Sequence, residues 1–145
     1  DPGERVVQAA LAAALRVEAV PGPCALIAGL TASGLPTGEF HFVGFLPHKS
    51  GRRLKVLQTL QSVSGTLVLY ESPYRIEKLL RELSQVFPGR RIVLARELTK
   101  RFEEFLRGEA CALLAETMDR KLKGEFVVMV GGLETPREPE VESGS

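Results

Sequence analysis

The sequence lacks several residues and patterns that mark particular classes of protein. It has no tryptophan and only two cysteines, Cys24 and Cys111, which lie far apart and outside any Cys-x-x-Cys or Cys/His ligand spacing. This spacing argues against a zinc site, so we predict no metal centre. Because both cysteines lie among apolar residues, we expect two buried free thiols, which fits a reducing, cytoplasmic location.

Long apolar segments and a strong net charge are also absent. No apolar run approaches the roughly 20 residues that cross a membrane, and residues 1–4 lack the basic start of a signal peptide, so we predict no membrane partner. The net charge is only +1, and nucleic-acid binding would therefore depend on a local basic patch. The glycine-rich dinucleotide motif, the P-loop, the zinc-protease motif and the nucleophile elbow are missing, which excludes the most common cofactor and hydrolase signatures.

The 145 residues instead contain apolar segments separated by Gly- and Pro-rich breaks, and they suffice for one domain with a real core. The segments alternate between strand-like and helix-like patterns, which predicts an α/β sandwich with a mixed sheet, and we expect the first helix to pack on this sheet. The tail at 133–145 is rich in Pro, Glu and Ser, and we predict that it is disordered. The predicted strands are 16–20, 40–45, 66–70, 91–95, 102–107 and 126–130, and the predicted helices are 4–15, 24–32, 50–62, 74–87 and 108–117.

The segment Val-Pro-Gly-Pro-Cys-Ala at 20–25 is the sharpest break in the chain. Pro21 cannot donate to a strand ladder and Gly22 can adopt positive φ, so a strand is expected to end here and a helix to begin. The free N–H groups at a helix N-terminus can hold a polar ligand. Taken alone, this segment is better explained as an ordinary strand-to-helix corner than as a binding site.

Four such junctions carry polar or conformationally special residues, at 21–25, 70–75, 96–100 and 123–126. If the preceding strands are parallel neighbours, the first three junctions meet at the carboxyl edge of the sheet, where α/β folds place ligands. Glu71 and Arg75 are spaced to pair across one helical turn, and a solvated ion pair is the simpler alternative. Glu97, which has basic neighbours, is equally consistent with a surface cluster.

A basic loop follows the strand at 40–45. Cations at the start of a helix oppose its dipole, which strengthens the case for an anionic partner such as phosphate or RNA, while a solvated helix start explains them equally well. Ser50 is a candidate N-cap for this helix. The basic residues of the loop are His48, Lys49, Arg52, Arg53 and Lys55.

Together these segments resemble one family over residues 1–132, in the same order along the chain. The family is the ribosomal RNA small subunit methyltransferase I family, within the tetrapyrrole (corrin/porphyrin) methylase superfamily. The matching segments are Val-Pro-Gly-Pro-Cys-Ala at 20–25, Gly-Leu-Pro at 34–36, Val-Gly-Phe-Leu-Pro at 43–47, Tyr-Glu-Ser-Pro at 70–73, Ala-Arg-Glu-Leu-Thr-Lys at 95–100 and Lys-Gly-Glu-Phe at 123–126.

The resemblance implies a class III S-adenosylmethionine-dependent enzyme that methylates the ribose 2′-hydroxyl of a decoding-centre cytidine in 16S rRNA. Such enzymes have two α/β domains with the methyl donor in the cleft between them, and they are typically homodimers. Residues 1–132 resemble the C-terminal domain only. We therefore expect this chain to supply half of the donor cleft, and to bind the donor weakly or not at all without the N-terminal domain.

The resemblance also implies roles for particular residues, although it assigns no catalytic base. A tetrapyrrole C-methyltransferase is an alternative that the basic loop and the Glu-Ser-Pro junction disfavour, and a non-catalytic RNA-binding or dimerisation module is an alternative from another class. The donor-binding candidates are Pro21, Gly22, Cys24, Ala25, Glu71, Leu98 and Phe126, and the candidates for contact with phosphates of 16S rRNA or the small ribosomal subunit are Lys49, Arg52 and Arg53.

Overall fold

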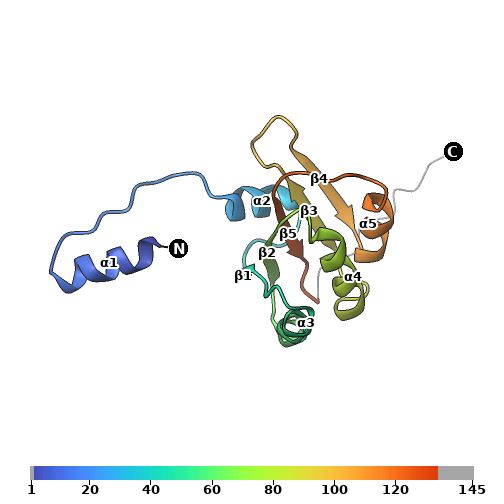
Figure 1. Ribbon diagram of the computed structural model, residues 1–145, viewed down its shortest axis with the longest axis horizontal. Coiled ribbons are helices and arrows are strands. Elements are labelled where there is room, and N and C mark those ends of the chain that lie inside the picture. Colours follow the sequence, from blue (N-terminus) through green and yellow to red (C-terminus); the bar gives the residue numbers. More distant parts are fainter. Residues whose placement is uncertain (1, 134–145) are drawn as a thin grey trace.

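The computed structural model describes residues 2–133, and a five-stranded mixed sheet forms its centre (Figure 1). The predicted tail therefore lies outside the described residues except for Leu133, which is exposed. The strands are β1 (Phe40–Phe45), β2 (Thr66–Glu71), β3 (Ile92–Arg96), β4 (Glu104–Gly108) and β5 (Phe126–Val130). The helices are α1 (Gly3–Ala12), α2 (Ala25–Ser33), α3 (Ser50–Thr59), the 3₁₀ turn η1 (Leu60–Ser62), α4 (Ile76–Val86) and α5 (Ala110–Thr117).

The strand directions bring several loops to one edge of the sheet. The spatial order is β1-β2-β5-β3-β4. Strand β1 is parallel to β2, whereas β5 is antiparallel to both β2 and β3. Strands β1, β2 and β3 therefore all end at the same edge, and β5 begins there.

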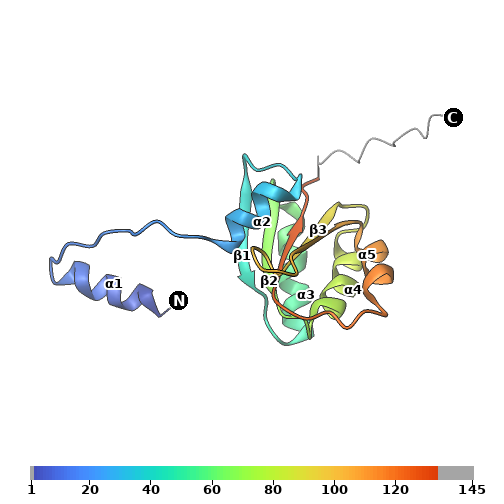
Figure 2. The ribbon, with the colours of Figure 1, turned by 90° about the horizontal axis from the view of Figure 1, so that it is seen from above.

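Helices cover both faces of the sheet, which confirms the predicted α/β sandwich (Figure 2). Helices α3, α4 and α5 pack on one face and α2 packs on the other. The strand side chains alternate accordingly: Phe126, Val128 and Val130 of β5 face the three helices, and Val127 and Met129 face α2. Because the central strands are buried on both faces, they are mostly apolar, with polar residues only at the ends of β2 and β3.

Most of the predicted elements are present. Strands β1 and β5 have the predicted bounds, α3 and η1 together span the predicted 50–62, and the other elements from α2 onward differ by at most two residues at each end. Helix α2 is followed by Gly34, which has φ 80° and so provides its left-handed C-cap.

The prediction for the N-terminal segment is wrong in two respects. Helix α1 forms, but it has no buried residue and lies away from the sheet at the end of an extended segment (Figure 1). Residues 16–20 are exposed and form no strand. Apolar periodicity shows that a segment has an apolar face, but it does not show which part of the protein buries that face. No other described segment covers the apolar face of this N-terminal segment.

The expectation of two buried thiols is also wrong, because Cys24 and Cys111 are both exposed. Cys24 immediately precedes α2, at the open edge of the sheet. Cys111 is on α5, whose buried residues are Ala110, Leu113 and Thr117.

Within residues 2–133, no helix combines the length and the apolar character that a membrane span requires.

Candidate functional site

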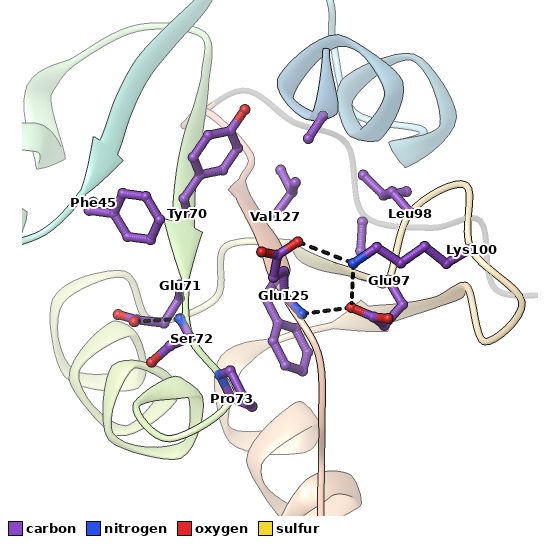
Figure 3. Close-up of a pocket in the computed structure, with 13 residues that line it drawn as sticks. Phe45, Tyr70, Glu71, Ser72, Pro73, Glu97, Leu98, Lys100, Glu125 and Val127 are labelled. Carbon is purple, nitrogen blue, oxygen red and sulfur yellow. Dashed lines mark hydrogen bonds and ion pairs between the residues drawn. The ribbon is translucent and has the colours of Figure 1, made fainter. Parts of the chain in front are cut away.

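A cavity of about 410 Å³ opens at the edge where β1, β2 and β3 end and β5 begins (Figure 3). Its volume falls within the range of small-molecule sites. All four junctions that the sequence analysis singled out contribute to it. The lining residues are Ala25, Phe45, Tyr70, Glu71, Ser72, Pro73, Ala95, Glu97, Leu98, Lys100, Glu125, Phe126 and Val127.

Glu71 is a buried carboxylate in the wall of this cavity. It is the last residue of β2, and its residue exposure is 4%. The Ser72 N–H donates to Glu71 Oε1 at 2.7 Å, and Arg75 Nε donates to the same oxygen at 2.9 Å. The predicted Glu71–Arg75 pair is therefore confirmed, and it fixes a carboxylate inside the site rather than on a solvated surface.

Tyr70 connects β2 to the first turn of α2. The Leu26 N–H donates to the Tyr70 hydroxyl oxygen at 3.1 Å. Burial raises the pKa of Tyr70, with this hydrogen bond acting in the opposite direction. The phenol therefore stays neutral, and Cys24 lies beside the same hydroxyl.

Gly29 allows α2 to lie close to the sheet. A Cβ at Gly29 would be 3.2 Å from Val127 Cγ1 and 3.4 Å from Leu98 Cδ1, which is tighter than ordinary side-chain contact. Because Gly29 has no side chain, α2 packs close to the sheet at this point. Ala25, one turn earlier on α2, therefore lines the same cavity as Leu98.

Three charged residues form a network on the opposite side of the cavity (Figure 3). The Glu125 N–H donates to Glu97 Oε1 at 2.9 Å, and Lys100 Nζ donates to the same oxygen at 3.0 Å and to Glu125 Oε2 at 3.2 Å. The Glu125 N–H, together with Lys100, lowers the pKa of Glu97, and Glu97 and Glu125 raise the pKa of Lys100. Glu97 and Lys100 therefore both remain charged at neutral pH.

The turn that holds this network is conformationally strained. Glu97 and Thr99 have φ angles of 50° and 65°, a region that costs an ordinary L-residue about 1–2 kcal/mol. Gly124 has φ 89°, and a Cβ at this position would overlap the Glu97 side chain. Such strain persists where the surrounding structure imposes it, and it is concentrated at functional sites.

The structure brings together four of the seven predicted donor-binding residues, Ala25, Glu71, Leu98 and Phe126, in the cavity wall. Cys24 lies beside Tyr70 just outside that lining. Pro21 and Gly22 are exposed in the extended segment before α2 and do not line the cavity.

The basic loop divides into an exposed part and a buried part. Lys49 and Arg52 are exposed, as contact with RNA requires. Arg53 is only 1% exposed and pairs with Glu82 of α4, with Arg53 Nη2 at 2.8 Å from Glu82 Oε1. The prediction that Arg53 contacts phosphate is therefore wrong, because its guanidinium joins α3 to α4.

Ser50 does not cap α3 either. Lys49 occupies the N-cap position and makes no side-chain cap hydrogen bond. The Ser50 hydroxyl donates to Glu82 Oε1 at 2.9 Å, so it belongs to the same buried cluster as Arg53.

Among residues 2–133, no three His, Cys, Asp or Glu side chains are grouped as a metal site would require.

Several lining residues were missed by sequence reasoning. Tyr70 had a usable signal, since it ends a buried strand and shares the face of Val68, which packs towards α2. Phe45 had no such signal in the sequence. A one-residue irregularity between Phe42 and Gly44 shifts the pairing of β1 with β2 and changes the direction in which the last side chain of β1 points. The pairing of Lys100 with Glu125 depends on the position of β5, which sequence spacing does not give.

The chain is similar in sequence to proteins of one family. The profile described as "Tetrapyrrole (Corrin/Porphyrin) Methylases" matches residues 1–113. A protein of Micromonospora olivasterospora named "Ribosomal RNA small subunit methyltransferase I" is 43% identical over 133 residues, covering 91% of this chain and 42% of its own. The protein of the same name from Xylella fastidiosa strain Temecula1 is 47% identical over 135 residues, covering 91% of this chain and 50% of its own. This chain thus spans about half the length of these relatives.

Solved structures give the same result for the fold. The methyltransferase CobJ superposes with a TM-score of 0.66 at 23% identity, over 92% of this chain and 60% of that chain. Uroporphyrin-III C-methyl transferase from Thermus thermophilus, complexed with S-adenosyl homocysteine, superposes with a TM-score of 0.56 at 22% identity, over 89% and 58% of the two chains. Because the family profile matches most of its length, the chain belongs to the tetrapyrrole (corrin/porphyrin) methylase family.

Proposed function

We propose that this chain forms one half of the donor cleft of an S-adenosylmethionine-dependent enzyme that methylates a ribose 2′-hydroxyl of 16S rRNA. One observation carries the proposal. Ala25, Glu71, Leu98 and Phe126 come from four separate segments, and all four line a single cavity at the strand-end edge. These are positions to which the family resemblance assigns the donor.

The charges of the cavity suit this donor. Its lining contains the carboxylates of Glu71, Glu97 and Glu125 and one ammonium group, that of Lys100. A net negative lining favours a ligand with a net positive charge, which S-adenosylmethionine has because its sulfonium and ammonium groups outweigh its carboxylate. The apolar side chains of Leu98, Phe126 and Val127 provide a surface for an adenosine ring.

The proposed chemistry requires mainly positioning from the protein. When bound, S-adenosylmethionine supplies an activated methyl group, so that the ribose 2′-oxygen forms an O–C bond as the C–S bond breaks and the 2′-hydroxyl proton passes to a base or to water. The chain's part is to hold the reactants in line. Glu71 is suited to this role, because Ser72 and Arg75 fix its carboxylate in one orientation. We assign no side chain as the base.

Two relatives that are 43% and 47% identical to this chain are named as ribosomal RNA methyltransferases, which supports ribosomal RNA as the substrate. We also propose a cytoplasmic location and, from the family resemblance, a decoding-centre cytidine as the target. Lys49 and Arg52 are exposed on the loop after β1 and are proposed to contact RNA phosphates.

The second half of the cleft is proposed to come from a preceding domain, with residues 2–133 as the C-terminal domain. The relatives are about twice as long as this chain, which leaves room for such a domain. Helix α1 also exposes apolar side chains that a neighbouring domain would bury, with Val6 69% and Leu11 59% exposed. We further infer a homodimer, which light scattering on the full-length protein tests.

Calorimetry and a methylation assay test the proposed function. We expect the full-length protein to bind S-adenosylhomocysteine and to transfer methyl groups to 16S rRNA in small subunits, with 2′-O-methylcytidine as the product. The 145-residue chain alone should bind the donor weakly or not at all. Micromolar donor binding by this chain alone would contradict the half-cleft, and a methylated base instead of a ribose would contradict the target.

A non-catalytic RNA-binding module is the second candidate, favoured by the exposed Lys49 and Arg52. It predicts RNA binding by the full-length protein without any methyl transfer. The same assay therefore separates the two candidates.

A further inference from the structure

We propose that Phe45 is the stacking platform for the base of the nucleotide whose ribose is methylated. The inference rests on the proposed function, because it names the part of the substrate that the same cavity receives. Phe45 is the last residue of β1, and its ring lies at the cavity beside Tyr70 (Figure 3).

The ring of Phe45 is largely uncovered. Its exposure is 67%, whereas the next residue, Leu46, is 6% exposed and belongs to the core. A single exposed apolar side chain is ordinary on a protein surface. Phe45 differs in its position, because its exposed ring also lines the cavity that contains Glu71.

Neighbouring rings hold Phe45 in place. The centroids of Phe45 and Tyr70 are 5.6 Å apart at an interplanar angle of 65°, and those of Phe42 and Tyr70 are 5.1 Å apart at 67°. Tyr70 is itself fixed by the hydrogen bond from the Leu26 N–H. Phe45 is therefore an ordered ring with free surface, which a flat ligand can cover at little entropic cost.

The charge around Phe45 indicates what kind of flat ligand this is. The sequence has no acidic residue between Glu39 and Glu71. The exposed Lys49 and Arg52 follow Phe45 closely, and Arg75 contacts the ring of His48 in the same loop. A flat ring at the start of a loop that carries exposed cationic side chains matches a nucleotide, which has a planar base and an anionic phosphate.

The carboxylates Glu97 and Glu125 lie on the other side of the cavity (Figure 3). Lys100 offsets only one of these two carboxylates, whereas the Glu71 carboxylate on the Phe45 side is paired with Arg75. The difference in net charge suits a cationic donor on one side and an RNA nucleotide on the other. A 2′-hydroxyl within a stacked helix cannot enter such a cavity, so the nucleotide must leave the stack. Stacking on an exposed aromatic ring offsets that cost, as in many RNA-binding proteins.

Substitution of Phe45 in the full-length protein tests the proposal. We expect Phe45→Ala to lower kcat/KM for the small subunit by roughly 5- to 150-fold, the loss that stacking of one base implies. The dissociation constant for S-adenosylhomocysteine should change less than twofold. Phe45→Trp should retain activity, and Phe45→Leu should remain impaired because leucine is apolar but has no flat face. Phe102→Ala is the matched control, because Phe102 is 66% exposed and does not line the cavity.

Three results would overturn the inference. Wild-type kcat/KM in Phe45→Leu would show that only apolar contact matters. A large loss of donor affinity in Phe45→Ala would assign the ring to the donor instead. A drop of several degrees in Tm for Phe45→Ala would show that another part of the full-length protein covers the ring.

Failure of the proposed function is distinguishable from these outcomes. If the wild-type protein transfers no methyl group to rRNA, the affinity for a short unpaired RNA oligonucleotide still measures stacking. A weakened affinity in Phe45→Ala would then support the platform, and an unchanged affinity would overturn it.

Discussion

Glu97 and Glu125 exchange two hydrogen bonds where β3 ends and β5 begins. The Glu97 N–H donates to the Glu125 carbonyl at 3.0 Å, and the Glu125 N–H donates to Glu97 Oε1 at 2.9 Å. This pair ties two segments that are distant in sequence into one side of the cavity. The geometry depends on Gly124, which leaves the space that the Glu97 side chain occupies.

We predict that Gly124→Ala damages the site as well as the fold. The φ of 89° at this position costs alanine about 1–2 kcal/mol of stability, and the new Cβ displaces the Glu97 carboxylate. Urea unfolding measures the first effect. Calorimetry with S-adenosylhomocysteine on the full-length protein measures the second, for which we expect a loss of donor affinity.

Gly89→Ala separates these effects. Gly89 has φ 73°, and a Cβ there would meet nothing within 4 Å. This variant should show a similar loss of stability with unchanged donor affinity. An equal loss of affinity in both variants would contradict a specific role for Glu97.

We predict that the buried pair of Arg53 and Glu82 is essential for stability. The two side chains are 1% and 7% exposed, so Arg53→Met leaves a carboxylate buried without its partner, at a cost of about 3–5 kcal/mol. Urea unfolding checks this value. If the variant does not fold, Arg53→Met combined with Glu82→Leu should restore much of the stability, because neither charge then remains.

An exposed pair on the same helix provides the control. Arg81 and Glu77 are 53% and 55% exposed, so Arg81→Met should cost at most about 1 kcal/mol. A similar cost for Arg53→Met and Arg81→Met would contradict the importance of burial.

Acid should destabilise the domain through Glu82. Burial alone would raise the pKa of Glu82, but hydrogen bonds from Arg53 and Ser50 outweigh it and lower the pKa. A group with a lowered folded pKa stabilises the fold above its unfolded pKa, near 4.3, and loses this contribution as pH falls through the folded pKa. We expect the unfolding free energy to decrease below about pH 4, with a shallower slope in Glu82→Gln. Identical slopes would exclude Glu82 as the source.

The two exposed cations of the basic loop should control the salt dependence of RNA binding. We predict that Lys49→Ala with Arg52→Ala weakens binding and reduces the slope of log K against log salt by about 0.7 for each phosphate that the variant no longer neutralises. Filter binding at several salt concentrations measures this slope. Lys78→Ala with Arg81→Ala on α4 removes the same charge elsewhere, and an equal change in slope there would refute a local contact.

The parts of the fold that local sequence determines were predictable. The strand at Phe126–Val130 follows from its continuous apolar run and the glycine cap at Gly34 from backbone preference, and tertiary contacts did not override either. The fate of residues 16–20 was not predictable, because a strand requires a neighbour and the pattern does not reveal whether one is present.

The site was predictable as a set of loops but not as a set of contacts. The junctions after β2 and β3 meet at one edge as expected, because the two strands share a direction, although β5 lies between them. The junction at 21–25 follows no strand, and it reaches the same edge through the start of α2. The role of Arg53 depends on Glu82, an acid 29 positions later that approaches only when α4 packs against α3. A basic cluster in sequence therefore does not distinguish a guanidinium that faces solvent from one that joins two helices.

The extended segment at 16–24 sets the true start of the folded unit. All of its residues are exposed, and it forms neither helix nor strand. Exposed segments of this kind are the preferred sites of proteolytic cleavage. Limited proteolysis of the 145-residue chain should therefore cut first within this segment and release α1. The resistant fragment should begin near Ala25, with the sheet and both of its helical layers intact.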